Sequence, residues 1–217
     1  MEISQLIVTL KTAIFSTVIT FFLGIFLAYR VTKMKKFKNL VDAKIILPMV
    51  LPPTVVGFFL ILIFGKKSLI GQFFLQFDIN FVFTWKAAII SAVIVSLPLM
   101  YRTTRGAFES LDKNIIFAAQ TLGASNKKIF LKIILSNARF GILAGIILSF
   151  TRALGEFGAT IMFAGNIPGK TQTMSTAIYS AVQANDYESA FQWAILIIIF
   201  SLVFIIFLNK LNDLKKI

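Results

Sequence analysis

The feature that most constrains this chain is a series of long apolar segments separated by short basic ones. Five segments are long enough to cross about 30 Å of hydrocarbon as helices. They are residues 3–31, 45–64, 86–101, 140–164 and 190–208. The chain is 58% hydrophobic and only 14% charged, which is too apolar for an ordinary soluble domain. We therefore expect an all-α membrane protein with five transmembrane helices and one domain over residues 1–217.

Prolines interrupt two of these segments. The second segment opens with Pro48, Pro52 and Pro53, and Pro98 lies within the third. Each proline removes a backbone donor, so a carbonyl oxygen in the membrane needs a protein or water partner. Broken helices often line a transport pathway. A kink that only improves packing explains the same prolines, and the residues alone leave both readings open.

The basic residues indicate how the chain lies in the membrane. The formal net charge is +13, which in a soluble protein would suggest a nucleic acid partner. Here the charges sit between apolar segments, so we expect a lipid bilayer and no nucleic acid. Residues 30–44, 102–139 and 210–216 together carry sixteen of the 22 Lys and Arg. Because basic loops stay in the cytoplasm, we expect the N-terminus outside and the C-terminus inside the cell.

The residue types that are missing narrow the possible chemistry. The chain has no Cys and no His, which excludes thiol chemistry, disulfides, most zinc sites and the usual general base. We therefore expect neither a catalytic residue nor a metal site.

The longest polar stretch, residues 102–139, predicts a loop with two short helices. Asp112 can cap the first helix, and Gly123 supplies the positive φ that ends it. Ser125 can cap the second, which we expect to run from Asn126 to about Asn137. Ala118 and Ala119 give the first helix a low surface that another protein can approach closely. From spacing alone, the loop is either a docking surface or an ordinary interfacial loop.

One polar stripe lies at membrane depth in the fourth segment. Arg152 and Glu156 are four residues apart, so they share a helix face and can pair. Charges at this depth face protein or water. The stripe either lines an anion path or holds helices together around a buried ion pair. Its members are Gly145, Ser149, Arg152, Glu156 and Thr160.

The segment Ala164–Thr171 fits a relaxed phosphate-loop pattern. A true phosphate loop follows a buried strand and opens a helix. This segment follows an apolar helix and faces the outside in the expected topology. We therefore predict an external turn built from Pro and Gly, and reject an ATP-binding role.

The loop resembles a motif of a known family. Residues 117–125 and 133–136 are similar to the "EAA" loop of binding-protein-dependent ABC importer permeases. Phe117 stands where the motif has Glu, and Ser136 where it has Pro. In that family the loop docks in a groove of a cytoplasmic ATPase. The resemblance therefore implies that the ATPase-coupling residues are Phe117, Ala118, Ala119, Gly123, Ala124 and Ser125.

Further stretches resemble the molybdate permeases of that family. They are residues 51–57, 83–85, 97–100, 152–160 and 165–173. The resemblance implies a type I ABC importer permease in the cell membrane, forming a homodimer with two ATPase subunits and an extracytoplasmic molybdate-binding protein. It implies no cofactor on this chain, with ATP bound by the partner. Thr54, in the first stretch, joins the stripe as a candidate path residue with Ser149, Arg152, Glu156 and Thr160.

Two alternatives to a molybdate importer remain. Tungstate and sulfate permeases share the expected architecture. An ion-coupled carrier or anion channel working alone is a more distant possibility. Five segments without an internal repeat argue against most carrier folds.

Overall fold

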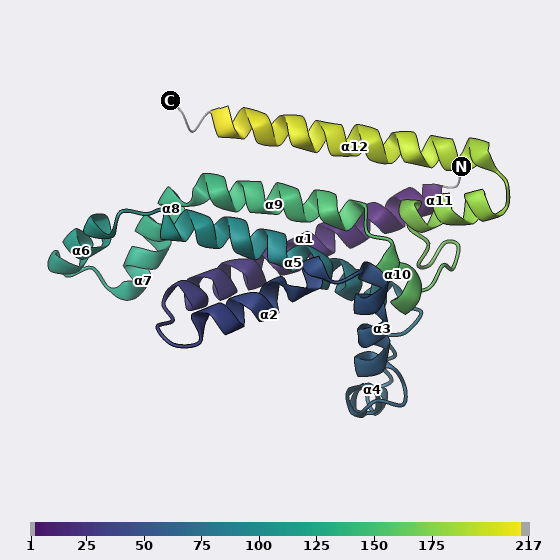
Figure 1. Cartoon of the computed structure of the whole chain (residues 1–217), viewed down its shortest axis with the longest axis horizontal. Coiled ribbons are helices and arrows are strands. Elements are labelled where there is room, and N and C mark those ends of the chain that lie inside the picture. The colour runs from purple at the N-terminus through teal and green to yellow at the C-terminus, as the bar shows by residue number, and fades with distance from the viewer. Residues whose placement is uncertain (1–2, 214–217) are drawn as a thin grey trace.

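The computed structural model describes residues 3–213, and all regular secondary structure over that range is helical (Figure 1). The longer helices are α1 (Ile3–Thr32), α2 (Lys38–Val50), α3 (Pro53–Phe64), α5 (Trp85–Glu109), α9 (Arg139–Leu154), α11 (Met174–Gln183) and α12 (Tyr187–Asp213). The shorter ones are α4 (Leu69–Leu75), α6 (Lys113–Thr121), α7 (Asn126–Ile129), a π-helical turn (Phe130–Ile134), α8 (Leu135–Asn137) and α10 (Gly158–Phe163). The all-α prediction is confirmed.

The predicted number of spans agrees with the helices. Three helices are long and apolar enough to cross a membrane: α1, α5 and residues Tyr187–Phe207 of α12. Two bent pairs, α2 with α3 and α7–α8 with α9, meet the same test together, which gives up to five spans. In Figure 1 the start of α1 and helix α11 lie at one end of the molecule, and α6, α7 and the end of α12 lie at the other. The chain is a multi-pass membrane protein.

The second predicted span, residues 45–64, is not one helix. α2 ends at Val50, α3 starts at Pro53, and the two are bent by 111°. Pro53 takes the first helical position, where a missing N–H breaks no helical bond. Leu51, which precedes Pro52, is extended, as residues before proline prefer. The break therefore falls at Pro52 and Pro53, two of the three prolines expected to interrupt the segment, whereas Pro48 lies inside α2.

The third span is longer than predicted. α5 runs from Trp85 to Glu109 straight through Pro98, which is buried. The expectation that Pro98 interrupts this helix is wrong, because packing on both sides holds the segment in place. Residues 102–109, expected in the loop, continue α5 instead. The loop therefore starts only at Ser110.

Two further predicted helices are divided. The helix expected over residues 126–137 contains a π-helical turn and is bent by 69° against α9. A π-helical turn inserts an extra residue into the helical repeat, which a sequence period does not reveal. The fourth span, residues 140–164, breaks after Leu154 and resumes at Gly158. The polar stripe expected on one continuous helix therefore crosses a break.

α1, α5 and α9 form the central bundle, and small residues allow close contact between them. A Cβ added at Gly24 would lie 2.5 Å from Met100 Cγ, and one at Gly145 would lie 2.5 Å from Thr103 Oγ1. The Thr17 hydroxyl donates to the Ala13 carbonyl oxygen at 2.6 Å. This contact satisfies the hydroxyl without water, as an apolar surrounding requires.

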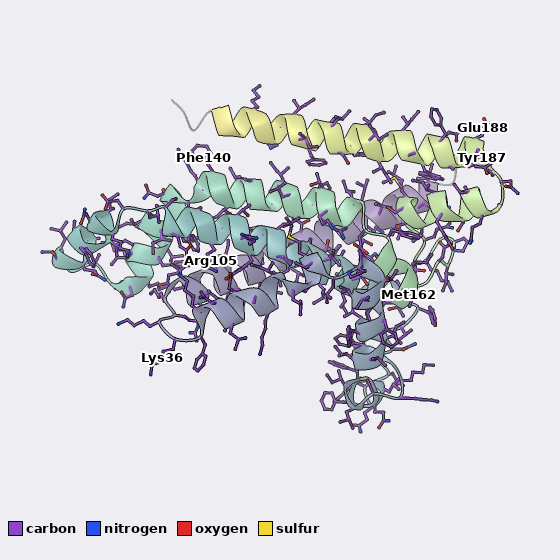
Figure 2. The ribbon with its side chains drawn as sticks, in the orientation of Figure 1. Lys36, Arg105, Phe140, Met162, Tyr187 and Glu188 are labelled. Atoms are coloured by element: carbon purple, nitrogen blue, oxygen red, sulfur yellow. The ribbon has the colours of Figure 1, made fainter. Side chains whose placement is uncertain are left out.

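α3 leaves this bundle and packs on α10, so that α3 and α4 project to one side (Figure 1). A Cβ on Gly158 would lie 2.8 Å from Pro53 Cβ, and one on Gly57 would lie 3.0 Å from Ala159 Cα. Figure 2 shows Met162, which a Cβ on Gly57 would also meet, where these two helices lie together. α3 and α10 therefore form one closely packed pair.

The turn predicted at Ala164–Thr171 is present. Gly165 and Gly169 have φ of 74° and 71°. The amides of Thr171 and Gln172 both donate to the Ile167 carbonyl oxygen, at 2.9 and 3.0 Å. The turn follows helix α10 rather than a strand, so it lacks the setting of a phosphate loop.

Candidate functional site

The first candidate site is the loop between α5 and α9, and its helix ends are formed as predicted. Asp112 Oδ1 accepts from the Asn114 amide at 2.9 Å, and Ser125 Oγ accepts from the Lys128 amide at 3.3 Å. Gly123 has φ of 75°. Its amide donates to the Gln120 carbonyl oxygen at 2.9 Å.

The next amide, that of Ala124, donates to the Ala119 carbonyl oxygen at 3.0 Å. Together these two bonds form a Schellman motif, which requires the positive φ that Gly adopts without strain.

Part of the exposed surface of α6 is apolar. Phe117 is 58% exposed and Leu122, at the end of the helix, is 87% exposed. Ala118 is exposed between them, while Ala119 is buried against the rest of the chain. Isolated apolar side chains on a surface need no explanation, but a cluster on a charged loop indicates an interaction site. Of the two alanines predicted to form a low surface, only Ala118 is available to a partner, because Ala119 packs into the core of this chain.

The loop is fixed to the ends of the central helices. Ala119 and Ile129 belong to a buried cluster with Tyr101 and Phe108 of α5. Phe130, in the π-helical turn, stacks near Tyr29 of α1 with ring centroids 4.3 Å apart. Packed side chains therefore connect the loop to α1 and α5.

The second candidate site lies at the break between α9 and α10. Arg152 Nη1 is 2.8 Å from Glu156 Oε2, in an ion pair whose angles are not those of a hydrogen bond. Glu156 Oε1 accepts from the Ala159 amide at 2.8 Å, so the carboxylate caps the start of α10. The Glu156 side chain is 2% exposed and that of Arg152 is 31% exposed. The guanidinium therefore reaches the surface while the carboxylate is buried.

The other residues predicted to line the translocation path differ in their exposure to the surface. Ser149 and Thr160 are buried, and Ser149 Oγ donates to the Ser96 carbonyl oxygen at 3.4 Å across the α5–α9 contact. Thr54, on α3, is exposed, and its backbone nitrogen would lie 3.2 Å from a Cβ on Gly158. The packing of α3 on α10 thus brings Thr54 beside the Glu156 turn. Arg152 and Thr54 are the two predicted path residues that reach the surface.

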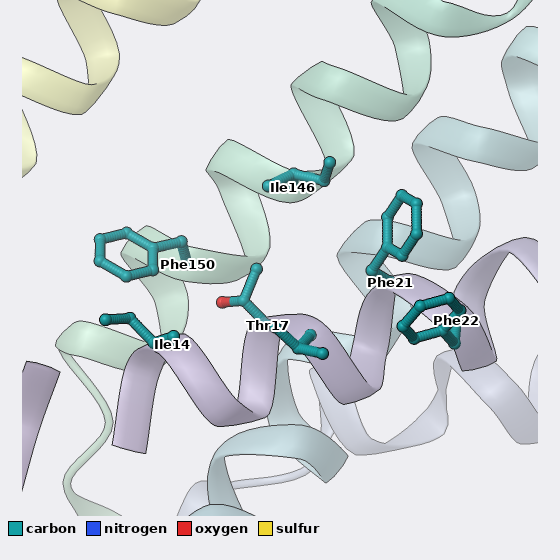
Figure 3. Close-up of a pocket in the computed structure, with 7 residues that line it drawn as sticks. Ile14, Thr17, Phe21, Phe22, Ile146 and Phe150 are labelled. Atoms are coloured by element: carbon teal, nitrogen blue, oxygen red, sulfur yellow. The ribbon is translucent and has the colours of Figure 1, made fainter. Parts of the chain in front are cut away.

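A groove of about 440 Å³ between α1 and α9 is not an anion site (Figure 3). Its lining is apolar except for one hydroxyl, that of Thr17, which already donates to Ala13. An anion placed there would lose its hydration without compensation. The lining residues are Ile14, Thr17, Val18, Phe21, Phe22, Ile146 and Phe150.

A polar cluster between α2 and α5 was not predicted from the sequence. Tyr101 Oη donates to Asp42 Oδ1 at 2.7 Å, and the Arg105 guanidinium also contacts that carboxylate. Arg105 Nε donates to Glu109 Oε1 at 2.9 Å, and Lys38 Nζ donates to the same oxygen at 2.8 Å. The i, i+4 spacing of Arg105 and Glu109 predicts one of these pairs, but the approach of α2 depends on tertiary structure.

Comparison with known protein families shows to which family the chain belongs. Residues 20–214 match the model of the binding-protein-dependent transport system inner membrane component family. The chain belongs to this family. It is the membrane component of a transport system that depends on a binding protein, and not the subunit that hydrolyses ATP.

Individual relatives and solved structures agree with this membership. The chain is 42% identical over 190 residues to the molybdenum transport system permease protein ModB of Haemophilus influenzae, covering 87% of this chain and 83% of ModB. It is 37% identical over 207 residues to the sulfate transport system permease protein CysT of Salmonella typhimurium, covering 95% and 75%.

Among solved structures, a bacterial ABC transporter involved in alginate import matches with a TM-score of 0.79 at 18% identity, covering 97% of this chain and 78% of that one. The predicted permease architecture is confirmed.

Proposed function

We propose that this chain is the membrane-spanning permease of an ATP-driven importer that carries molybdate into the cytoplasm. The observation that carries the proposal is the coverage of 87% of the chain by a molybdenum permease at 42% identity. The capped, exposed α6 loop supports an ATPase partner, which supplies the ATP and the hydrolytic site. Arg152, the one cation inside the fourth span, supports an anionic substrate, because an arginine fork matches the oxygens of a tetrahedral anion.

We further propose a homodimer with two ATPase subunits and an extracytoplasmic molybdate-binding protein. Arg152 and Thr54 reach the surface of a single chain rather than lining an enclosed cavity. A second copy facing the first would enclose them. The projecting pair α3–α10 supports the same arrangement, because Phe58, Phe59 and Leu62 on α3 are each half exposed. Large apolar patches of this kind are covered by protein or lipid.

The orientation in the membrane can be tested directly, because the chain has no cysteine of its own. We expect single cysteines at Lys67 and Lys170 to react with an impermeant thiol reagent in intact cells. Cysteines at Lys36 and Lys210 should react only after the cells are opened. All four side chains are exposed, so burial does not explain a difference. The reverse labelling pattern would invert the proposed topology.

Substrate choice is the finer part of the proposal, since a sulfate permease is also a relative. The experiment is uptake of radioactive molybdate by cells that carry the permease, its ATPase and its binding protein. We expect unlabelled molybdate to compete strongly, and sulfate to compete only at a large excess. Sulfate competing as well as molybdate would assign the chain to sulfate transport. Tungstate competing better than molybdate would make tungstate the substrate.

A further inference from the structure

The polar cluster between α2 and α5 has no role in the function proposed above. It consists of Lys38 and Asp42 on α2, with Tyr101, Arg105 and Glu109 on α5, and we call it the α2–α5 clasp. Figure 2 shows Arg105 where these two helices run together. The side chains of Arg105 and Asp42 are only 17% and 28% exposed. Water and dissolved salt weaken the attraction within such an enclosed, hydrogen-bonded ion pair less than they weaken it in an exposed pair.

α2 depends on the clasp more than other long helices do. None of its residues is buried. Its apolar contacts come from Val41, Ile45 and Ile46, which are only partly buried against the core. The clasp adds two polar contacts on that side, one from Asp42 to Arg105 and Tyr101 and one from Lys38 to Glu109. The position of α2 relative to α5 is therefore set largely by side-chain bonds.

The two ends of the clasp lead to the two candidate sites. Glu109 ends α5, and the chain enters α6 three residues after Ser110, at Lys113. On the other side, α2 leads through Pro52 into α3, which packs on α10 beside the Glu156 turn. A second route from the loop reaches that turn directly along α9. α5 also packs directly on α3 and α10, and the clasp adds a further connection through α2.

We propose that Asp42 and Arg105 are positioning residues that make α2 and α3 move with α5 when the ATPase displaces α6. The clasp then delivers the movement to the α3–α10 side of the candidate path, while α9 delivers it to the Arg152 side. The proposal rests on the proposed function only in that an ATPase drives the loop.

The test replaces the ionic link by a covalent one. In the assembled complex, the variant with Asp42→Cys and Arg105→Cys is compared with wild type for anions imported per ATP hydrolysed. Without a cross-link, we expect this ratio to fall roughly three- to thirtyfold, the range typical of a lost coupling contact. A short bifunctional thiol reagent should restore the ratio, and a monofunctional reagent should not. Lys36→Ala, which removes a cation from the neighbouring loop, should leave the ratio unchanged.

Each other outcome has a definite meaning. A normal ratio in the double variant without a cross-link would overturn the proposal. A cross-linked complex that hydrolyses ATP without importing would also overturn it, because α2 would then have to move against α5. If the wild-type complex itself shows no ATP-driven uptake, the proposed function fails instead.

Discussion

Replacing Gly123 by Val leaves the permease inserted in the membrane but separates ATP hydrolysis from uptake. A Cβ at this position meets no heavy atom within 4 Å, so the damage comes only from the backbone. At φ of 75° a β-branched residue costs at least about 1–2 kcal/mol. Relieving that strain breaks the two hydrogen bonds that the Gly123 and Ala124 amides donate at the end of α6. Leu122, at the end of α6, then shifts relative to Phe117, and the surface proposed to bind the ATPase is altered.

The measurement is co-purification of the ATPase subunit, together with anion uptake and binding-protein-stimulated ATP turnover. We expect either loss of the ATPase or turnover without uptake. Gly169→Val is a matched control, because Gly169 also has a positive φ and open space around its Cα. It lies in the turn that the proposed topology places outside the cell, so it should carry the same strain without affecting the ATPase. Normal coupling in the Gly123 variant, at normal expression, would show that this loop does not transmit the stroke.

Replacing Arg152 by Ala has the second large effect, and it tests the path directly. The change strands the buried Glu156 carboxylate, which keeps only its bond to the Ala159 amide. Leaving one partner of a buried pair alone costs about 3 kcal/mol or more, and the partial exposure of Arg152 places this case at the low end. We therefore expect a lower melting temperature as well as loss of uptake.

Companion variants separate these two effects. Changing Arg152 and Glu156 together to Met removes the stranded charge, so stability should return while uptake stays absent. Arg152→Lys keeps the cation and should restore part of the uptake. Thermal unfolding of the purified complex and uptake in cells are the two measurements. If the double Met variant recovers both stability and uptake, the ion pair only holds helices together and Arg152 does not contact the anion.

Local signals predicted the helix ends of the loop between α5 and α9. Asp112, Gly123 and Ser125 act within a few residues of their own positions, because a cap or a positive φ depends on adjacent backbone. The five apolar segments also identified the spans, because crossing a bilayer requires length and hydrophobicity that few other structures need.

The helix breaks were harder to predict because they depend on tertiary partners. Pro98 stays within a helix while Pro52 and Pro53 form a bend of 111°, although each removes a donor. The difference lies in the consecutive prolines and in the α10 surface that receives α3. Glu156 was predicted to pair with Arg152, but its cap on α10 required the break at Gly155. The π-helical turn leaves no clear sequence period.

The candidate path was only partly predictable for the same reason. Ser149 and Thr160 share the spacing of Arg152, but the interior of the chain buries both of them. Asp42 and Arg105 lie more than sixty positions apart and belong to different predicted elements. A sequence pattern contains no information on which charged residues of two separate helices meet. The clasp could therefore not be predicted without knowing that α2 packs against α5.

The central claim is that this chain imports an oxyanion only as part of an ATP-driven complex. The most direct measurement is accumulation of radioactive molybdate in vesicles containing the purified permease, with and without the ATPase subunit, the binding protein and ATP. Our account predicts accumulation only when all three are present, and none with the Gly123→Val permease. Accumulation by the permease alone, driven by an ion gradient or by the molybdate gradient itself, would contradict it.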